Sequence, residues 1–126
     1  KEAYDEAVHE LISALDRAEE LLGKQRYVLG AQFTYMDIRL FNTLVRFDPV
    51  YVVYFKTNKC SIESNYANLF SYIRDVYQMP GVGRSINMQH TKMHYFTSHP
   101  HLNPFGVIPA GRDTKLDGPH DRNRFT

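Results

Sequence analysis

The chain has 126 residues, of which 43% are hydrophobic and 23% are charged, and its formal net charge is +1. This length suits one soluble domain with its own core, and the small net charge gives no electrostatic argument for a nucleic-acid partner. No apolar run reaches the roughly 18 to 20 residues that span a bilayer, and a single cysteine, Cys60, excludes an internal disulfide and suits the cytoplasm.

The first expected helix covers residues 3–22. Its apolar residues recur at helical spacing along one face: Tyr4, Val8, Leu11, Ile12, Leu15, Ala18 and Leu22. Gly23 is a plausible stop directly after it. Because the chain begins inside this helix, without a starting Met or a cap, we expect it to be a fragment of a longer protein.

The second expected helix begins at Thr34 and lies at the centre of the domain. Thr34 and Asp37 fit a capping box, in which each side chain accepts a hydrogen bond from the other residue's backbone N–H. Phe33 and Ile38 stand where a hydrophobic staple would pair them. One helix face is apolar throughout, formed by Ile38, Phe41, Leu44 and Val45.

Pro49 interrupts this helix, because proline lacks a backbone donor and crowds the preceding turn. We expect a kink near Phe47 and Asp48 and a helical continuation to Phe55. The β-branched run VYVVYF is also compatible with a strand, but a lone strand without a partner would be unstable. Residues 56–65 are polar and predict a loop.

A third helix is expected over residues 66–77, capped by Asn65, and a weaker fourth helix over residues 85–96. The last thirty residues contain four of the six prolines and three of the seven glycines, a composition typical of extended chain. The sequence therefore predicts an all-α fold, with a helical bundle over residues 1–97 and an irregular arm over residues 98–126.

The apolar residues of this arm predict that it packs against another surface. They are Leu102, Phe105, Val107 and Ile108. One interpretation is a strap over the arm's own bundle. The other is an arm that covers an active-site mouth or a subunit boundary.

Histidine and cysteine offer weak candidate sites. His90 and His94 share a helix face, as a zinc pair would, but a site needs further ligands and no HExxH pattern occurs. Surface histidines are therefore the preferred interpretation, and we expect no metal. The ammonium of Lys59 would lower the pKa of Cys60, yet no paired base is evident, so a lone exposed thiol is favoured over a nucleophile.

Three tyrosines are better candidates. Tyr51 and Tyr54 follow the proline, and Tyr95 lies where the fourth helix ends. Phenols hold aromatic substrates by ring contact, hydrogen-bond their oxygens and donate protons to a developing phenolate. The alternative is that these tyrosines only fill the core of the bundle.

Longer segments resemble a known family. FTYMDIRL resembles the N-capping motif of the central helix in the C-terminal domain of cytosolic glutathione transferases. RFDPVYVVYFKTNK, YIRDVYQMPGV, HYFTSHPHLNPFGVIPAG and PHDRNRF resemble the Xi class, the Omega-like S-glutathionyl-hydroquinone reductases. The resemblance extends over essentially the whole chain. It implies an all-α domain of the glutathione-transferase C-terminal type in a homodimeric enzyme.

The resemblance also implies a reaction. In this class a cysteine of a Cys-Pro-Trp motif, on an N-terminal thioredoxin-like domain that binds glutathione, attacks the sulfur of a glutathionyl-hydroquinone. The helical domain supplies the pocket for the aromatic ring. Tyr95 would then be the catalytic proton donor or hydrogen-bond partner of the leaving phenolate. Tyr51 would lie on the far side of the ring, with Tyr54 as a further substrate-binding residue.

This chain lacks the Cys-Pro-Trp motif and a thioredoxin-like pattern. We therefore expect the chain alone to be inactive, as the substrate-binding domain of a larger glutathionyl-hydroquinone reductase. The alternative is a helical module without catalytic function that is retained for interaction or assembly.

Overall fold

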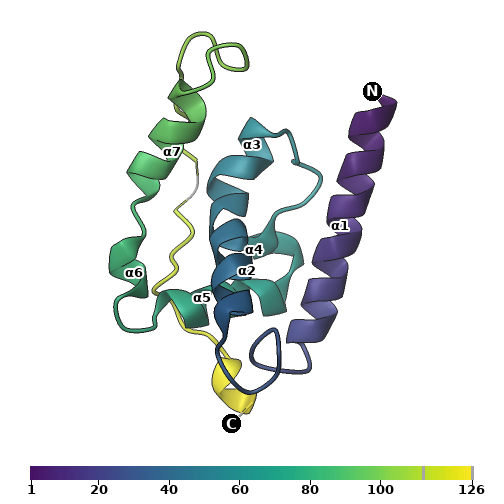
Figure 1. Cartoon of the computed structure of the whole chain (residues 1–126), viewed down its shortest axis with the longest axis vertical. Coiled ribbons are helices and arrows are strands. Elements are labelled where there is room, and N and C mark those ends of the chain that lie inside the picture. Colours follow the sequence, from purple (N-terminus) through teal and green to yellow (C-terminus); the bar gives the residue numbers. More distant parts are fainter. Residues whose placement is uncertain (112, 126) are drawn as a thin grey trace.

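The computed structural model describes residues 1–111 and 113–125, and these ranges contain helices joined by turns and irregular chain, with no strand (Figure 1). The all-α prediction is confirmed. The elements are α1 (Glu2–Leu22), α2 (Tyr35–Arg46), η1 (Phe47–Tyr51), α3 (Val52–Tyr54), α4 (Ile62–Asn65), α5 (Ala67–Tyr77), α6 (Val82–Ser85), α7 (Met88–Thr97) and η2 (Arg122–Phe125).

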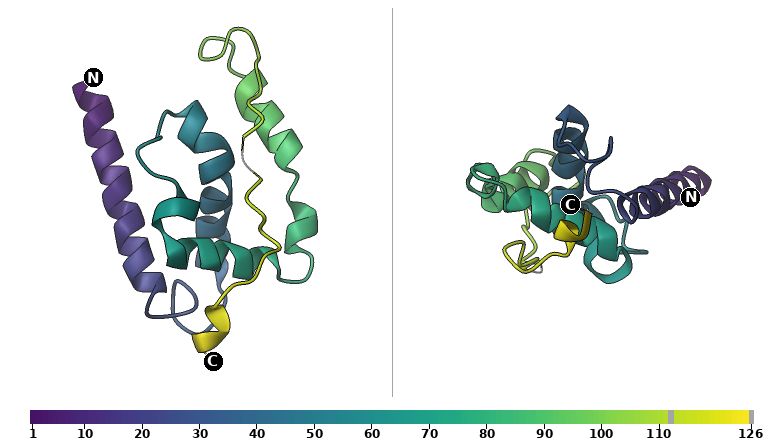
Figure 2. Two further views of the ribbon diagram at one scale, coloured as in Figure 1. Left: turned by 180° about the vertical axis from the view of Figure 1, so that it is seen from behind. Right: turned by 90° about the horizontal axis from the view of Figure 1, so that it is seen from below.

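The helix α2 is central, with α1 on one side of it and α6 and α7 on the other (Figure 1). The helix α5 crosses beneath and contacts both α1 and α2. After α7 the chain turns and runs back along the bundle to the end where α1 and α2 are joined (Figure 2). Residues 1–111 and 113–125 contain no candidate membrane-spanning helix.

The expected apolar face of α2 is buried over most of its length. Phe41, Leu44 and Val45 are each less than 5% exposed and pack in the main core. Ile38 is 45% exposed, and Phe33 packs edge-on against Tyr27 at a centroid distance of 5.7 Å while staying 39% exposed. The expected staple therefore buries neither of its residues.

The capping box of α2 is confirmed, and its Asp37 does more than cap the helix. One carboxylate oxygen accepts from Thr34 N at 2.9 Å. The other oxygen accepts from Val28 N at 2.9 Å and from the Tyr72 hydroxyl at 2.9 Å. Asp37, which is fully buried, thus joins the α1–α2 connection, α2 and α5.

Pro49 does not end the central helix. The interruption is a π turn, η1, and α3 continues to Tyr54 with Phe55 as its C-cap. π turns occur as single-turn insertions inside α-helices, and this one contains Pro49, so the chain stays helical past the missing donor. The preference for helix over strand is confirmed, with an end one residue earlier than expected.

The predicted cap of the third helix is wrong. Asn65 closes α4, a short helix inside the expected loop, and Tyr66 is the N-cap of α5. The free amides at the start of α5 donate to the Glu19 carboxylate of α1, from Asn68 N at 2.9 Å and from Leu69 N at 2.8 Å. The cap therefore comes from a neighbouring helix.

Two further boundaries differ from prediction. The expected fourth helix is present as α7, which begins at Met88, and the short helix α6 before it was not predicted. Asn87 caps α7 by accepting from His90 N at 3.0 Å. Gly23 ends α1 in a right-handed conformation, with φ of −75°, so a left-handed turn is not what requires glycine there. A Cβ at Gly23 would come within 3.1 Å of the Asn68 side chain.

The C-terminal arm is extended as expected, apart from η2, while Arg112 and Thr126 lie outside the described residues. Its apolar side chains are exposed by 42% to 89%, so a strap that buries them on its own bundle is wrong: Leu102, Phe105, Val107 and Ile108. Among the described residues of the arm, Arg122 is the one that is fully buried.

Candidate functional site

The fold brings the three predicted tyrosines together. Tyr51 in η1 and Tyr54 in α3 meet Tyr95 in α7, with ring-centroid distances to Tyr95 of 5.7 Å and 5.8 Å. The hydroxyl oxygens of Tyr51 and Tyr95 lie 3.3 Å apart.

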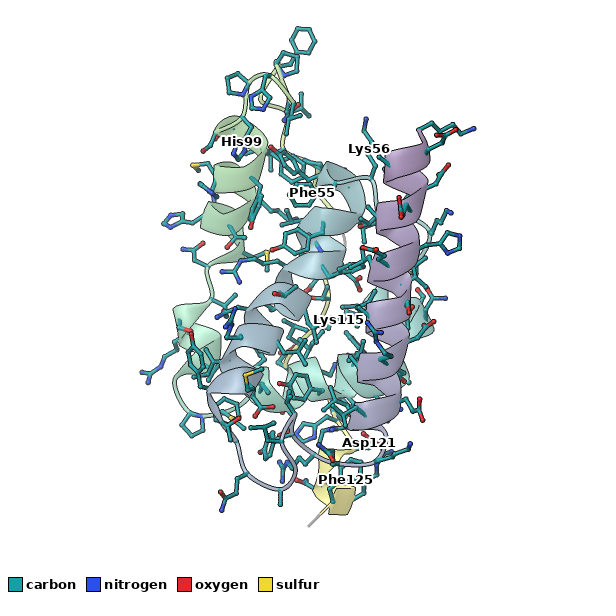
Figure 3. The ribbon with its side chains drawn as sticks, turned by 45° about the vertical axis from the view of Figure 1, so that its right-hand side comes forward. Phe55, Lys56, His99, Lys115, Asp121 and Phe125 are labelled. Carbon is teal, nitrogen blue, oxygen red and sulfur yellow. The ribbon has the colours of Figure 1, made fainter. Side chains whose placement is uncertain are left out.

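Local helix geometry explains this convergence. Residues three apart on a helix face the same side, so Tyr51 and Tyr54 both point toward α7. Phe96, which is 4% exposed, anchors α7 there, with its ring centroid 5.1 Å from that of Tyr54. Phe55 and His99 lie at the same end of the bundle and flank the cluster (Figure 3).

The Tyr51 and Tyr95 side chains open into a hollow of about 340 Å³ between α2, η1 and α7. Its lining is mostly polar: Asn42, Thr43, Arg46, Tyr51, Thr91, His94 and Tyr95. Two aromatic rings and two phenolic hydroxyls suit a small aromatic ligand that carries oxygen substituents. Arg46 was not singled out from the sequence, where it belongs to the polar face of the expected helix.

The hydroxyl pair keeps hydrogen-bonding capacity for a ligand. Each phenol has one donor proton and can also accept. The Tyr51–Tyr95 hydrogen bond uses one of the two protons, so the second is available to donate to an oxygen in the hollow. Because a distance of 3.3 Å leaves no room for an aromatic ring between the two oxygens, the expectation that Tyr51 faces Tyr95 across a substrate is wrong in this arrangement.

Tyr51 is held in its neutral form. Partial burial raises the pKa of Tyr51 to about 12, the hydrogen bond with Tyr95 adds to the rise, and the positive charge of Arg46 opposes it. Tyr51 therefore stays protonated at neutral pH and serves as a donor or acceptor.

Tyr54 has a different place from the other two tyrosines. It does not line the hollow, and its ring packs among neighbouring rings that include those of Tyr95 and Phe96. Its hydroxyl is buried without a hydrogen-bond partner in the described part of the chain. These contacts fit a residue that supports the position of Tyr95.

Cys60 differs from expectation in both exposure and acidity. The thiol is half-buried against the main core, in the loop between α3 and α4. Burial raises the pKa of the Cys60 thiol above its ordinary value, so the expected lowering by Lys59 is wrong. A thiol of this kind is protonated and unactivated at neutral pH.

His90 and His94 both lie on α7. The described residues contain no group of three or more histidine, cysteine or acidic side chains placed to hold a metal ion. His94 lies near the tyrosines instead, with its ring centroid 5.3 Å from that of Tyr95.

A family model for the glutathione S-transferase C-terminal domain matches residues 1–75. The chain is 51% identical to glutathionyl-hydroquinone reductase YqjG of Escherichia coli K12 over 98% of its length. It is 42% identical to glutathionyl-hydroquinone reductase PcpF of Sphingobium chlorophenolicum over 94%. It spans 37% of the length of each of these two relatives.

Solved structures agree with these matches. Glutathione-bound YqjG superimposes with a TM-score of 0.92 over 97% of this chain and 39% of that chain, at 51% identity. A Xi class glutathione transferase from Natrialba magadii gives a TM-score of 0.94 over 98% of this chain and 38% of that chain, at 42% identity.

Proposed function

The chain belongs to the glutathione S-transferase family as a C-terminal domain, and from this premise we propose that it is the aromatic-substrate domain of a glutathionyl-hydroquinone reductase. The whole protein would remove glutathione from hydroquinone thioethers. The relatives that carry this activity by name support the proposal. The observation that carries it is the Tyr51–Tyr95 hydroxyl pair at the hollow between η1 and α7.

The pair suits the electron flow of such a reaction. When a thiolate attacks the sulfur of a glutathionyl-hydroquinone, a sulfur–sulfur bond forms and the carbon–sulfur bond breaks. The ring carbon that loses sulfur must carry a proton, which it holds in the keto tautomer of the substrate. The electron pair of the broken carbon–sulfur bond then re-forms the aromatic ring, and negative charge develops on the former carbonyl oxygen, which takes a proton to become the phenol. A hydrogen bond from an O–H group to such an oxygen stabilises the transition state more than it stabilises the ground state. This difference lowers the activation free energy of the reaction.

We assign to Tyr95 the role of donating to the ring oxygen. Tyr51 supports Tyr95 through the hydrogen bond between their hydroxyls, and its raised pKa keeps Tyr51 protonated. Tyr54 would hold the Tyr95 ring from behind. The attacking thiol and most of the glutathione site would lie outside this chain, since Cys60 is half-buried with a raised pKa. On this proposal the chain alone is inactive, and the whole protein is a cytoplasmic homodimer.

Replacing Tyr95 by phenylalanine in the full protein should lower turnover of a glutathionyl-hydroquinone by roughly 100-fold, the lower end of what a proton donor contributes. The ring is kept, so packing in the cluster should change little. The measurement is hydroquinone release at saturating glutathione. Tyr35→Phe is the matched control, because Tyr35 is 68% exposed on α2 and does not line the hollow.

Turnover that is unchanged in Tyr95→Phe would remove Tyr95 from the mechanism. If the wild-type protein releases no hydroquinone at all, the reductase proposal fails and a non-catalytic interaction module takes its place.

A further inference from the structure

The permanent charge on the lining of the hollow is positive. Among its lining residues Arg46 is the one with a permanent charge, and none is acidic. The ion pairs found in the described part of the chain do not include Arg46. The hollow therefore presents an uncompensated positive charge beside the tyrosine hydroxyls.

Most of the Arg46 guanidinium is available to a ligand. Its Nη1 donates to the backbone oxygen of Asn42, one turn earlier on α2, and this bond holds the side chain along the helix. A guanidinium has five N–H groups, and Nε and Nη2 donate to no other group of the described residues. A planar fork of this kind matches a carboxylate.

The positive charge reaches the hydroxyl pair. Arg46 favours the ionised form of Tyr51, against the opposing effects of burial and of the Tyr95 hydrogen bond. A negative charge on a ligand in the same hollow would feel the same attraction. A neutral ligand would gain little from it.

We propose that Arg46 is a specificity-determining residue. It makes the hollow bind hydroquinones with a negatively charged oxygen group on the ring, above all a carboxylate, more tightly than neutral ones. This inference rests on the proposed function for the identity of the ring and adds the charge of its substituent. One ring oxygen lies at the tyrosine hydroxyls, and the anionic group lies at the Arg46 guanidinium. His94, on the opposite wall, offers a ring nitrogen as a further polar contact.

The test is binding to the full protein without glutathione, so that it does not depend on turnover. The two probes are a hydroquinone carboxylate, gentisate, and its uncharged methyl ester, which differ mainly in charge. Gentisate should bind about tenfold more tightly than the ester to the wild type, the value of one charge-assisted hydrogen-bonded pair. Calorimetric titration measures both dissociation constants.

Arg46→Gln should abolish this preference by weakening gentisate about tenfold while the ester is unaffected. Arg46→Lys, which keeps the charge without the planar fork, should restore part of it. Arg39→Gln is the matched control on the same helix, because Arg39 stacks near Tyr35, outside the hollow, and should keep the full preference.

Three results would overturn the inference: a wild type without preference, an Arg46→Gln protein that keeps the preference, or an Arg46→Gln protein that weakens both probes equally. The last result, with an unchanged circular dichroism spectrum, would mean that Arg46 maintains the shape of the hollow but does not discriminate between charged and uncharged ligands. Failure of the Tyr95→Phe turnover test would leave these binding results unaffected, so the two proposals fail separately.

Discussion

Arg122→Ala should lower the free energy of unfolding by about 3–5 kcal/mol, because buried carbonyls lose their donors and a large buried side chain is removed. The Arg122 guanidinium is fully buried although it lies three residues before Phe125, the last residue that the structure describes. Nη1 donates to Leu22 O at 2.6 Å, and Nη2 donates to Gln25 O at 2.8 Å and to Arg26 O at 2.7 Å.

The loss of stability has two sources, the carbonyl acceptors and the space left by the arginine side chain. The accepting carbonyls lie at the C-terminal end of α1 and in the turn after it, where helix geometry leaves carbonyls without partners. A cation there also interacts favourably with the helix dipole. With alanine, the buried carbonyls lose their donors and a cavity opens beneath the Phe125 ring, whose centroid lies 4.7 Å from the guanidinium carbon.

Urea unfolding followed by circular dichroism measures the change. The control is Arg124→Ala, two residues away, where the arginine is exposed and pairs with Asp121, also exposed. That variant should lose less than about 1 kcal/mol. A loss below about 1 kcal/mol for Arg122→Ala as well would show that the C-terminal segment does not clamp the bundle.

Asp37→Asn should be the second costly substitution, at about 2–4 kcal/mol, because a buried carboxylate with four donors loses part of its hydrogen bonding. An amide has one acceptor oxygen, so its NH₂ group would face either the Thr34 N–H or the Val28 N–H and the Tyr72 hydroxyl. Because a backbone N–H cannot accept a hydrogen bond, the asparagine NH₂ group would face a second donor in either orientation.

Thermal and urea unfolding both report this change. Asp117→Asn is the matched control, since Asp117 is exposed on the C-terminal arm, and it should alter stability by less than about 0.5 kcal/mol. Equal stability of the two variants would contradict the role of Asp37 as the residue that joins three segments.

Interactions between residues close in the sequence were predictable. The Thr34–Asp37 box, the apolar stripe of α2 and the extent of α1 depend on spacings of three or four residues, and each is present in the structure. The π turn was not foreseen in its form, because proline predicts an interruption without determining how the chain accommodates it.

Interactions between distant residues were missed. Glu19 caps α5 from 49 positions away, so the local candidate Asn65 was chosen wrongly. Arg122 reaches Leu22 over 100 positions, and nothing near Arg122 in the sequence indicates burial. Such contacts follow from the packing of the helices and have no local pattern.

At the candidate site, the choice of residues was predictable from the sequence, but their arrangement in space was not. Resemblance and spacing selected Tyr51, Tyr54 and Tyr95, and the fold gathers them. The sequence did not show that two hydroxyls pair on one side of the hollow while the third is buried away from it. Arg46 was assigned to the polar face of the helix. The π turn after it brings residues five apart closer than an α-helix does, which places Arg46 beside Tyr51.

The proposed function requires that the Tyr51–Tyr95 hydroxyl pair binds an oxygen of the hydroquinone. The most direct measurement is nuclear magnetic resonance of the full protein with ¹³C at the phenolic carbon of tyrosine, titrated with hydroquinone. The Tyr51 and Tyr95 resonances should shift together and saturate with one dissociation constant, while the resonance of exposed Tyr35 should not move. Saturable binding that shifts other tyrosines and leaves this pair unchanged would contradict this requirement.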